Sequence, residues 1–312
     1  MRQPLSLGMM LSRVDRRAAL VGRKGAPVDL PIRDVLRPAS LDEAVAMLAD
    51  HPTAMAIAGG TDLAVQLRDG RRHADIVVDL GRLELGFVRE RGELLEIGAG
   101  ATMDVIAGSP AVRAAAPALA AAAAQVGAWP IQCRATLGGN LGNASPAADT
   151  APPLLVAEAS VELVGPAGVR WLPLVDFFSG PGRTFRQPGE LIRTVRVPRL
   201  PAGGRERFVK LGPRREQVIA VVNLAARVLA GEGGRLERVR IAVGSAAPTP
   251  VRARHAEAAL EGRAPSSEVR REALVALLED LSPIDDHRAP ASYRRLAAAV
   301  LLDRFLEEVC GG

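Results

Sequence analysis

The chain has 312 residues, of which 48% are hydrophobic, and this size and composition are typical of a globular protein with two domains, or with one large domain and a smaller one. Its formal net charge is +5 at pH 7, but the arginines are scattered along the chain. Aromatic residues make up only 3% of the sequence and do not interleave with a basic stripe, which argues against a nucleic-acid-binding surface.

Residues 1–30 are interpreted as an N-terminal extension. Arg16 and Arg17 resemble a twin-arginine export signal, but Arg23 and Lys24 interrupt the apolar run that should follow them. No later segment approaches the roughly 20 apolar residues that a membrane-spanning helix needs. We therefore expect a protein without a membrane span.

Alternating helix and strand patterns predict a small α/β unit at about residues 31–86. Residues 38–50 have the pattern of a helix with Ser40 as N-cap and a glutamate three residues later, which is a capping box. Apolar runs at 54–58 and 76–80 predict two buried strands, and a pair of glycines follows the first of them.

Residues 87–200 are predicted to form a second unit that is richer in strands. Its expected elements are a strand at 94–97, an alanine-rich helix at 111–126, a loop at 136–150, a helix at 153–159 and, after several short β-rich runs, a strand at 191–197.

The Pro-, Gly- and Arg-rich stretch 198–207 is the best linker in the chain, and a C-terminal domain is expected at 205–312. Asp285 and Asp286 are interpreted as caps of its last helix. The domain is predicted to be a three-stranded antiparallel sheet with helices, so that the fold class is α+β. Its strands are expected at 207–211, 219–230 and 236–244, and its helices at 252–261, 266–280 and 291–309.

Two glycine-containing segments are the best candidates for a binding site. The first is AGGTDL at 58–63, and the second is TLGGNLGNASP at 136–146. Glycine permits positive φ angles and lets backbone N–H groups approach a pyrophosphate without obstruction by a Cβ atom. Threonine, serine and asparagine add side-chain donors. Together the segments predict that one diphosphate is bound from two sides.

Other patterns argue against alternative chemistries. Residues 98–103 begin like a dinucleotide fingerprint, but Met103 stands at the third glycine position, so a Rossmann fold is rejected. The sequence lacks GxSxG, HExxH and a P-loop lysine. Its two cysteines, Cys133 and Cys310, cannot ligate an iron–sulfur cluster and fit a reducing cytoplasm. Without an acid–base constellation, the chain fits a protein whose cofactor performs the chemistry.

Taken together, the two glycine segments resemble the paired FAD motifs of the FAD-binding medium subunits of molybdenum hydroxylases, the xanthine and carbon monoxide dehydrogenase family. That family has a first motif close to AGGTDL and a second motif TIGGN followed by a stretch like NASPAADTxPxLLA. This chain has TLGGN at 136–140 and NASPAADTAPPLL at 143–155. The similarity covers about residues 31–310 and includes PASLDEA at 38–44, GELI at 189–192 and ASYR at 291–294.

The resemblance implies a vanillyl-alcohol-oxidase (PCMH)-type FAD-binding domain at 31–200, in subdomains of about 31–86 and 87–200, followed by the family's small α+β C-terminal domain. It implies FAD as cofactor and no catalytic or metal-ligating residue in this chain. The implied FAD contacts are Ala56, Ile57, Ala58, Gly59, Gly60, Thr61, Asp62, Leu63, Thr136, Leu137, Gly138, Gly139 and Asn140 around the diphosphate, Asp149, Ile192 and Lys210 as further contacts, and Val126 and Ile219 at the flavin ring.

The chain departs from the family pattern just before the second motif. The family has a stretch like RQIRNRGT, whereas this chain has WPIQCRAT at 129–136. Pro130 and Cys133 are expected to alter the loop that faces the flavin or a partner, and Trp129 is as compatible with packing as with flavin contact. The benzoyl-CoA-reducing branch carries an inserted four-cysteine cluster motif, which a chain with two cysteines cannot hold.

The resemblance implies an electron-relay subunit of a heteromer. A molybdopterin-binding large subunit and a 2Fe–2S small subunit are the expected partners, in a cytoplasmic dimer of heterotrimers. Two alternatives remain open. One is a self-sufficient flavin oxidase of the same superfamily, and the other is a cofactor-free interaction subunit that keeps the fold.

Overall fold

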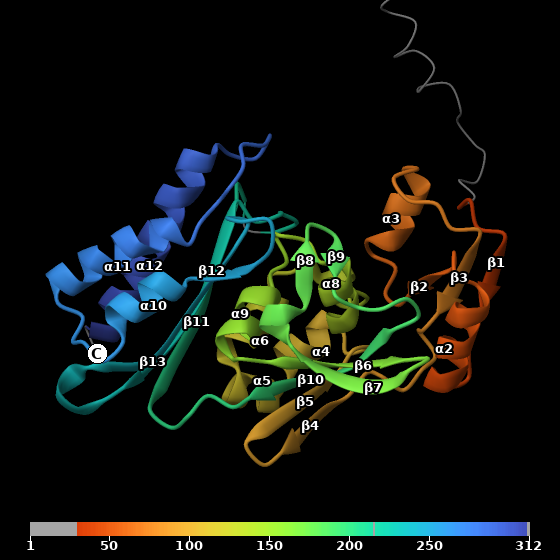
Figure 1. The fold of residues 1–312 in the computed structure, drawn as a ribbon, viewed down its shortest axis with the longest axis horizontal. Coiled ribbons are helices and arrows are strands. Elements are labelled where there is room, and N and C mark those ends of the chain that lie inside the picture. Colours follow the sequence, from red (N-terminus) through yellow and green to blue (C-terminus); the bar gives the residue numbers. More distant parts are fainter. Residues whose placement is uncertain (1–29, 215, 311–312) are drawn as a thin grey trace, which may run out of the picture.

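Residues 30–214 and 216–310 are described by the computed structural model of the chain (Figure 1). The expected extension, residues 1–30, lies outside the described part except for its last residue. From right to left, Figure 1 shows a three-stranded sheet, a five-stranded sheet with a layer of helices, and a four-stranded sheet covered by further helices. No helix of the described part is both long enough and apolar enough to cross a membrane.

The first layer is a parallel sheet in the order β1-β3-β2. Its helix α2 begins after Ser40, whose Oγ accepts a hydrogen bond from the Glu43 backbone N–H at 3.1 Å. The predicted N-cap at Ser40 is thus confirmed. The Glu43 carboxylate also reaches back, as in a capping box, but accepts from the N–H of Ala39, the residue before the cap, at 2.6 Å. The elements are β1 (Asp34–Leu36), α2 (Leu41–Asp50), β2 (Met55–Ile57), α3 (Leu63–Arg68) and β3 (Ile76–Asp79).

The middle layer is an antiparallel sheet in the order β4-β5-β10-β6-β7. Helices pack on it around a large core that contains Leu95, Ile97 and Val195. The strands are β4 (Val88–Arg91), β5 (Leu94–Gly98), β6 (Ser160–Gly165), β7 (Gly168–Pro173) and β10 (Leu191–Pro198), with a small hairpin of β8 (Phe178–Gly180) and β9 (Arg183–Thr184). The helices are α4 (Met103–Gly108), α5 (Pro110–Ala115), α6 (Pro117–Ala123), α7 (Trp129–Gln132), α8 (Leu137–Asn143) and α9 (Ala151–Val156).

Two sequence-based expectations for this layer are wrong. The single helix expected at 111–126 is divided at Ala116, which has φ −150° and ψ 67°, because Pro117 disfavours helical geometry in the residue before it. The loop expected at 136–150 begins with a helix, α8. Its N-cap is Thr136, whose Oγ1 accepts a hydrogen bond from the Gly139 N–H at 3.1 Å.

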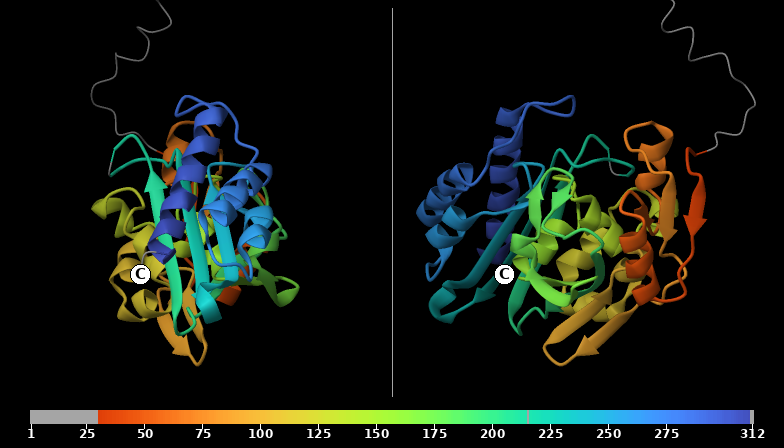
Figure 2. Two further views of the ribbon diagram at one scale, coloured as in Figure 1. Left: turned by 90° about the vertical axis from the view of Figure 1, so that its left-hand side faces the viewer. Right: turned by 45° about the vertical axis from the view of Figure 1, so that its right-hand side comes forward.

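The third layer is an antiparallel sheet in the order β11-β12-β13-β14, one strand more than expected because the two-residue β14 extends it. The C-terminal helices cover one face of this sheet, and the middle layer lies on its other side (Figure 2). Alternate residues of β12 face opposite sides, so that Ala225 joins the core of the middle layer and Leu224 joins the core beneath the C-terminal helices. The elements are β11 (Gly204–Leu211), β12 (Val222–Ala230), β13 (Leu236–Gly244), β14 (Val251–Arg252), α10 (Arg254–Leu260), α11 (Ser267–Glu279) and α12 (Ala291–Cys310).

The start of α12 is held by the two predicted acidic residues. Asp285 accepts a hydrogen bond from the Ala291 N–H at 2.5 Å, so its capping role is confirmed. Asp286 forms ion pairs with Arg288, at 2.6 Å, and with the buried Arg294, at 2.5 Å. These pairs join the last helix to the segment before it.

Candidate cofactor-binding site

A large cleft of about 830 Å³ lies where the three layers meet. Its walls come from β2 and α3 of the first layer, from α8 and the β9–β10 connection of the middle layer, and from the loop between β11 and β12 (Figure 1). A volume of this size is typical of cofactor and small-molecule sites. All residues predicted to contact FAD line the cleft, except Leu137 and Lys210.

Both glycine segments line the same cleft, and the first packs against the backbone that leads into the second. A Cβ atom added to Gly59 would lie 1.8 Å from the carbonyl oxygen of Arg134, just before the second segment. A Cβ atom on Gly138 would lie 2.7 Å from the Ala99 side chain. Gly60 has φ +74°, a conformation that favours glycine. The glycines therefore serve packing as well as access for a ligand.

Asp149 lines the cleft, is buried, and accepts hydrogen bonds from two side-chain donors of the chain. Its Oδ2 accepts from Lys210 Nζ at 2.6 Å, and its Oδ1 accepts from Asn223 Nδ2 at 2.9 Å. Lys210 also donates to the carbonyl oxygen of Gln125 at 2.8 Å. Burial raises the pKa of Asp149, and the hydrogen bonds and charge of its partners oppose that rise. Lys210 thus lies behind Asp149 rather than on the cleft wall.

Two arginines that the sequence analysis did not select, Arg72 and Arg186, line the cleft. Arg186 is partly buried, donates from Nε to Thr184 Oγ1 at 3.2 Å, and donates from a terminal nitrogen to the Glu190 carbonyl oxygen at 3.2 Å. Burial lowers the pKa of Arg186; the negative charge of Glu190 opposes this shift, and the positive charge of Arg72 adds to it. In an arginine-rich chain, neither position carries a sequence signal.

The Glu190 carboxylate does not neutralise these two arginines through a hydrogen bond. It accepts from Arg170, in a two-pronged contact at 2.7 and 2.9 Å, and from the Gln187 N–H at 2.6 Å. Within the described part of the chain, Arg72 has no ion pair. The charge of Glu190 acts on Arg186 without a direct ion pair, and this carboxylate already pairs with Arg170. Two guanidinium groups at a cleft that offers them no direct carboxylate contact favour an anionic ligand. The diphosphate of a dinucleotide fits that requirement.

The mouth of the cleft is apolar and exposed. Ile219 is 63% exposed, lies in the loop before β12 and lines the cleft together with Val126. A hydrogen bond from the Gln217 N–H to the Gly127 carbonyl oxygen, at 2.9 Å, joins this loop to the segment between α6 and α7. Trp129 is 66% exposed and is not among the lining residues, so this structure places its side chain neither in the core nor in the cleft wall.

The segment that departs from the family pattern forms the short helix α7, which has Pro130 in its first turn. Its Ile131 lines the cleft, whereas Cys133 lies at the end of the helix beside Asp104. Burial raises the pKa of the Cys133 thiol, and the negative charge of Asp104 raises it further. A thiol in such surroundings is a poor nucleophile.

Comparisons with known proteins agree with this geometry. The FAD binding domain in molybdopterin dehydrogenase matches residues 30–200, and the CO dehydrogenase flavoprotein C-terminal domain matches residues 207–309. The putative xanthine dehydrogenase FAD-binding subunit of Escherichia coli K12 is 33% identical over 277 residues, which are 87% of this chain and 94% of that protein. The nicotinate dehydrogenase FAD-subunit of Eubacterium barkeri is 33% identical over 78% of this chain and 84% of its own length.

Solved structures give the same result. A chain of carbon monoxide dehydrogenase from Hydrogenophaga pseudoflava superposes with a TM-score of 0.85 at 31% identity, over 88% of this chain and 96% of that one. A chain of quinoline 2-oxidoreductase from Pseudomonas putida 86 also superposes with a TM-score of 0.85, at 28% identity, over 91% and 99% of the two chains. The expected α+β fold and the cofactor FAD are thereby confirmed. The chain belongs to the FAD-binding medium subunits of the xanthine and carbon monoxide dehydrogenase family, which are oxidoreductase subunits of the molybdenum hydroxylase type.

Proposed function

We propose that this chain holds FAD as the electron relay of a heteromeric molybdenum hydroxylase, between a 2Fe–2S partner subunit and a terminal acceptor. The observation that carries the proposal is a cleft wall of glycine backbone and two arginines without a free acid or base. Bound FAD supplies the redox chemistry. The carboxylates that line the cleft are all hydrogen-bonded within the chain: Asp62 to Gln66, Asp149 to Lys210 and Glu190 to Arg170.

The residues of the cleft have distinct roles in this proposal. The backbone of Ala56 to Leu63 and of Thr136 to Asn140 surrounds the diphosphate, and Ile192 contacts the cofactor further along the cleft. Ile219 and Val126 pack against the flavin ring at the mouth. Lys210 acts through Asp149, because its ammonium group is buried behind that carboxylate.

Arg186 and Arg72 hold the ADP half of FAD, and this assignment makes the first prediction. Arg186→Gln should weaken FAD binding by about tenfold, since a charged hydrogen-bond partner contributes about 1.5–3 kcal/mol. Riboflavin, which lacks phosphate groups, should bind both proteins equally. Titration of the apo-protein with each flavin, followed by fluorescence, measures the effect. Arg183→Gln removes an exposed arginine of β9 that does not line the cleft and serves as control. An equal loss for both flavins would contradict the assignment.

The two alternative functions fit the cleft less well. A self-sufficient flavin oxidase needs a base beside the flavin, but no histidine lines the cleft, and its three carboxylates have protein partners. A cofactor-free interaction subunit gains nothing from two arginines that line a cleft and form no direct ion pair within the described residues. The relay therefore remains the function that this site supports best.

The partners are inferred from what the chain lacks. A flavin relay needs a donor within electron-transfer reach, and two cysteines cannot ligate an iron–sulfur cluster. We propose a 2Fe–2S small subunit and a molybdopterin-binding large subunit as partners, in a cytoplasmic dimer of heterotrimers. A permanent interface of this kind buries roughly 2,000 Å² or more in total.

Affinity purification of the tagged chain at native expression tests the relay. We expect it to recover an iron–sulfur subunit and a molybdopterin subunit, and to yield a protein with the absorption bands of oxidised flavin. Two results would contradict the proposal. One is recovery of a monomer that oxidises its own substrate and reduces an acceptor, and the other is a full complex without flavin.

A further inference from the structure

Ser245 belongs to the C-terminal domain and contacts two segments that line the large cleft, although it does not line the cleft itself. It directly follows β13, is 7% exposed, and has φ +63°, a left-handed conformation that residues other than glycine rarely adopt. The contacts around such a residue must offset its conformational cost, and strained residues of this kind cluster at functional sites. Its contacts therefore indicate what the strain serves.

Each polar group of Ser245 bonds to a different segment of the chain. Its backbone N–H donates to the carbonyl oxygen of Pro146 at 2.8 Å, and its hydroxyl donates to the carbonyl oxygen of Ala220 at 3.1 Å. Its own carbonyl oxygen accepts from a terminal nitrogen of Arg294 at 3.0 Å. One buried residue thus links three segments that are far apart in the sequence.

Two of these segments belong to different parts of the cleft wall. Pro146 ends the second glycine segment, and its neighbours Ser145 and Ala147 line the cleft. Ala220 directly follows Ile219 in the loop between β11 and β12, which we call the flavin-side loop. Ser245 therefore connects the part of the wall that the proposed function assigns to the diphosphate with the part that it assigns to the flavin.

The third segment is the start of α12, which holds the same loop. Arg294 is 1% exposed and, besides its bond to Ser245, donates to the carbonyl oxygen of Val221 at 2.7 Å. Arg288 donates to the carbonyl oxygen of Ala220 at 3.1 Å. The end of the flavin-side loop is thus fixed by the C-terminal domain, and Ser245 is the contact that also reaches the second glycine segment.

We infer that Ser245 is a positioning residue of the cofactor cleft, which holds the flavin-side loop in a fixed place relative to the second glycine segment. This inference rests on the proposed function, in which Ile219 packs against the flavin ring. A wall that is already ordered binds a ligand more tightly than one that must be ordered on binding, because immobilising a loop costs free energy. The Ser245 hydroxyl contributes to FAD affinity in this way without contacting the cofactor.

Ser245→Gly separates positioning from stability. Glycine adopts positive φ without strain, so the relief of strain should offset the lost hydrogen bond. The FAD-free full-length chain should then unfold at about the denaturant concentration of the wild type. Its affinity for FAD, measured by fluorescence titration, should nevertheless fall about fivefold, which corresponds to about 1 kcal/mol, the typical net contribution of one hydrogen bond. ADP, which lacks the flavin, should bind both proteins equally.

Ser245→Ala distinguishes the hydroxyl from the backbone. This variant also lacks the hydroxyl but retains a Cβ atom at positive φ, so it should be less stable than Ser245→Gly. Because both variants lose the same hydrogen bond to Ala220, we expect them to share the same reduced affinity for FAD.

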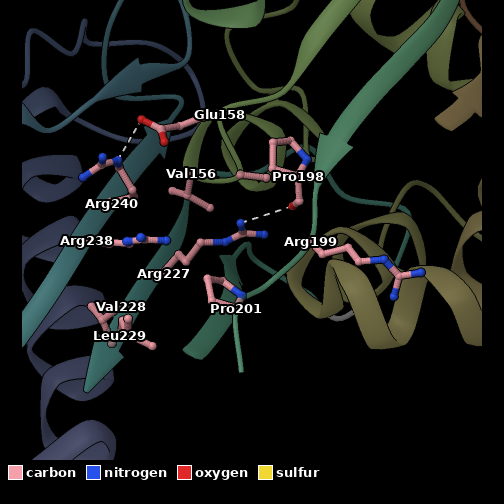
Figure 3. A pocket seen from close by; sticks show the side chains of 11 residues that line it. Val156, Glu158, Pro198, Arg199, Pro201, Arg227, Val228, Leu229, Arg238 and Arg240 are labelled. Atoms are coloured by element: carbon pink, nitrogen blue, oxygen red, sulfur yellow. Dashed lines mark hydrogen bonds and ion pairs between the residues drawn. The ribbon is translucent and has the colours of Figure 1, made fainter. Parts of the chain in front are cut away.

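Arg238→Gly is the matched control. Arg238 is an exposed residue of β13 with φ +49°, and it lines a small cavity of about 120 Å³ that shares no lining residue with the large cleft (Figure 3). This variant relieves the same kind of backbone strain in the same strand region, and it should leave FAD affinity unchanged.

The inference is overturned if the wild-type chain binds FAD and Ser245→Gly binds it equally well. It is also overturned if Ser245→Gly and Arg238→Gly weaken FAD binding equally, or if Ser245→Gly loses as much affinity for ADP as for FAD. A wild-type chain that binds no FAD would instead refute the proposed function, and the inference would fall with it.

Discussion

Gly139→Val should abolish FAD binding while leaving the chain folded. Gly139 lines the large cleft on α8, and a Cβ atom there would contact only the Thr136 hydroxyl, at 2.9 Å. The remaining space around it is open, so the two valine methyl groups extend toward the volume that the diphosphate needs. We expect the flavin content of the purified protein to fall from about one per chain to less than about a tenth of that, because a steric block is not relieved by local adjustment. Flavin absorbance relative to protein absorbance measures this content.

Gly108→Val provides the control for introducing valine at a helical glycine away from the cleft. Gly108 lies in α4, lines no part of the cleft, and has open space where a Cβ would be added. Both variants replace a helical glycine by a residue whose helix propensity is higher by roughly a few tenths of a kcal/mol, so propensity alone should not unfold either of them. Circular dichroism should show a folded protein in both cases, and only the control should retain flavin. Normal flavin content in folded Gly139→Val would remove Gly139 from the binding wall.

Asp149→Ala should destabilise the chain strongly, in addition to weakening FAD retention. The substitution leaves the Lys210 ammonium buried without its counter-charge, and the Lys210 side chain is only 3% exposed. Breaking a buried ion pair by removal of one partner costs about 3–5 kcal/mol. Asp149→Asn should cost less, because its side-chain oxygen can still accept one hydrogen bond from Lys210. Denaturant unfolding of the FAD-free chain measures the free energy of unfolding without the contribution of the ligand.

The double variant Asp149→Ala with Lys210→Met separates the ion pair from the cofactor contact. Removal of both charges should restore most of the free energy of unfolding that Asp149→Ala loses, since no buried charge then remains unpaired. FAD retention should stay reduced in the double variant if the Asp149 side chain contacts the cofactor, because that contact is still missing. If Asp149→Ala binds FAD normally and keeps its stability but no longer transfers electrons, Asp149 takes part in the chemistry. Its assignment as a cofactor contact that pairs with Lys210 is then wrong.

Features that depend on neighbouring residues were predictable from the sequence. The N-cap at Ser40 and the cap at Asp285 need only a few residues in a row, and the backbone forms them wherever the helix begins. The glycine segments at 58–63 and 136–146 likewise have a local signature, which was specific enough to identify the family. The prediction of helices failed where adjacent residues favour different backbone conformations. At Ala116, Pro117 divides a helix that the helix propensity of alanine alone would continue.

Only the tertiary structure decided which charges meet. Lys210 and Asp149 are 61 residues apart, and Asn223 and Asp149 are 74 residues apart, so no local pattern links them. The same holds for Arg186 and Arg72 at the large cleft, which look like any other arginine in the sequence. The sequence by itself determined the glycine backbone that a diphosphate requires, because the missing Cβ atom and the access to positive φ angles are properties of glycine itself. The charges around that backbone were decided by the packing of three sheets, because Coulomb interactions depend on distances in space and not along the chain.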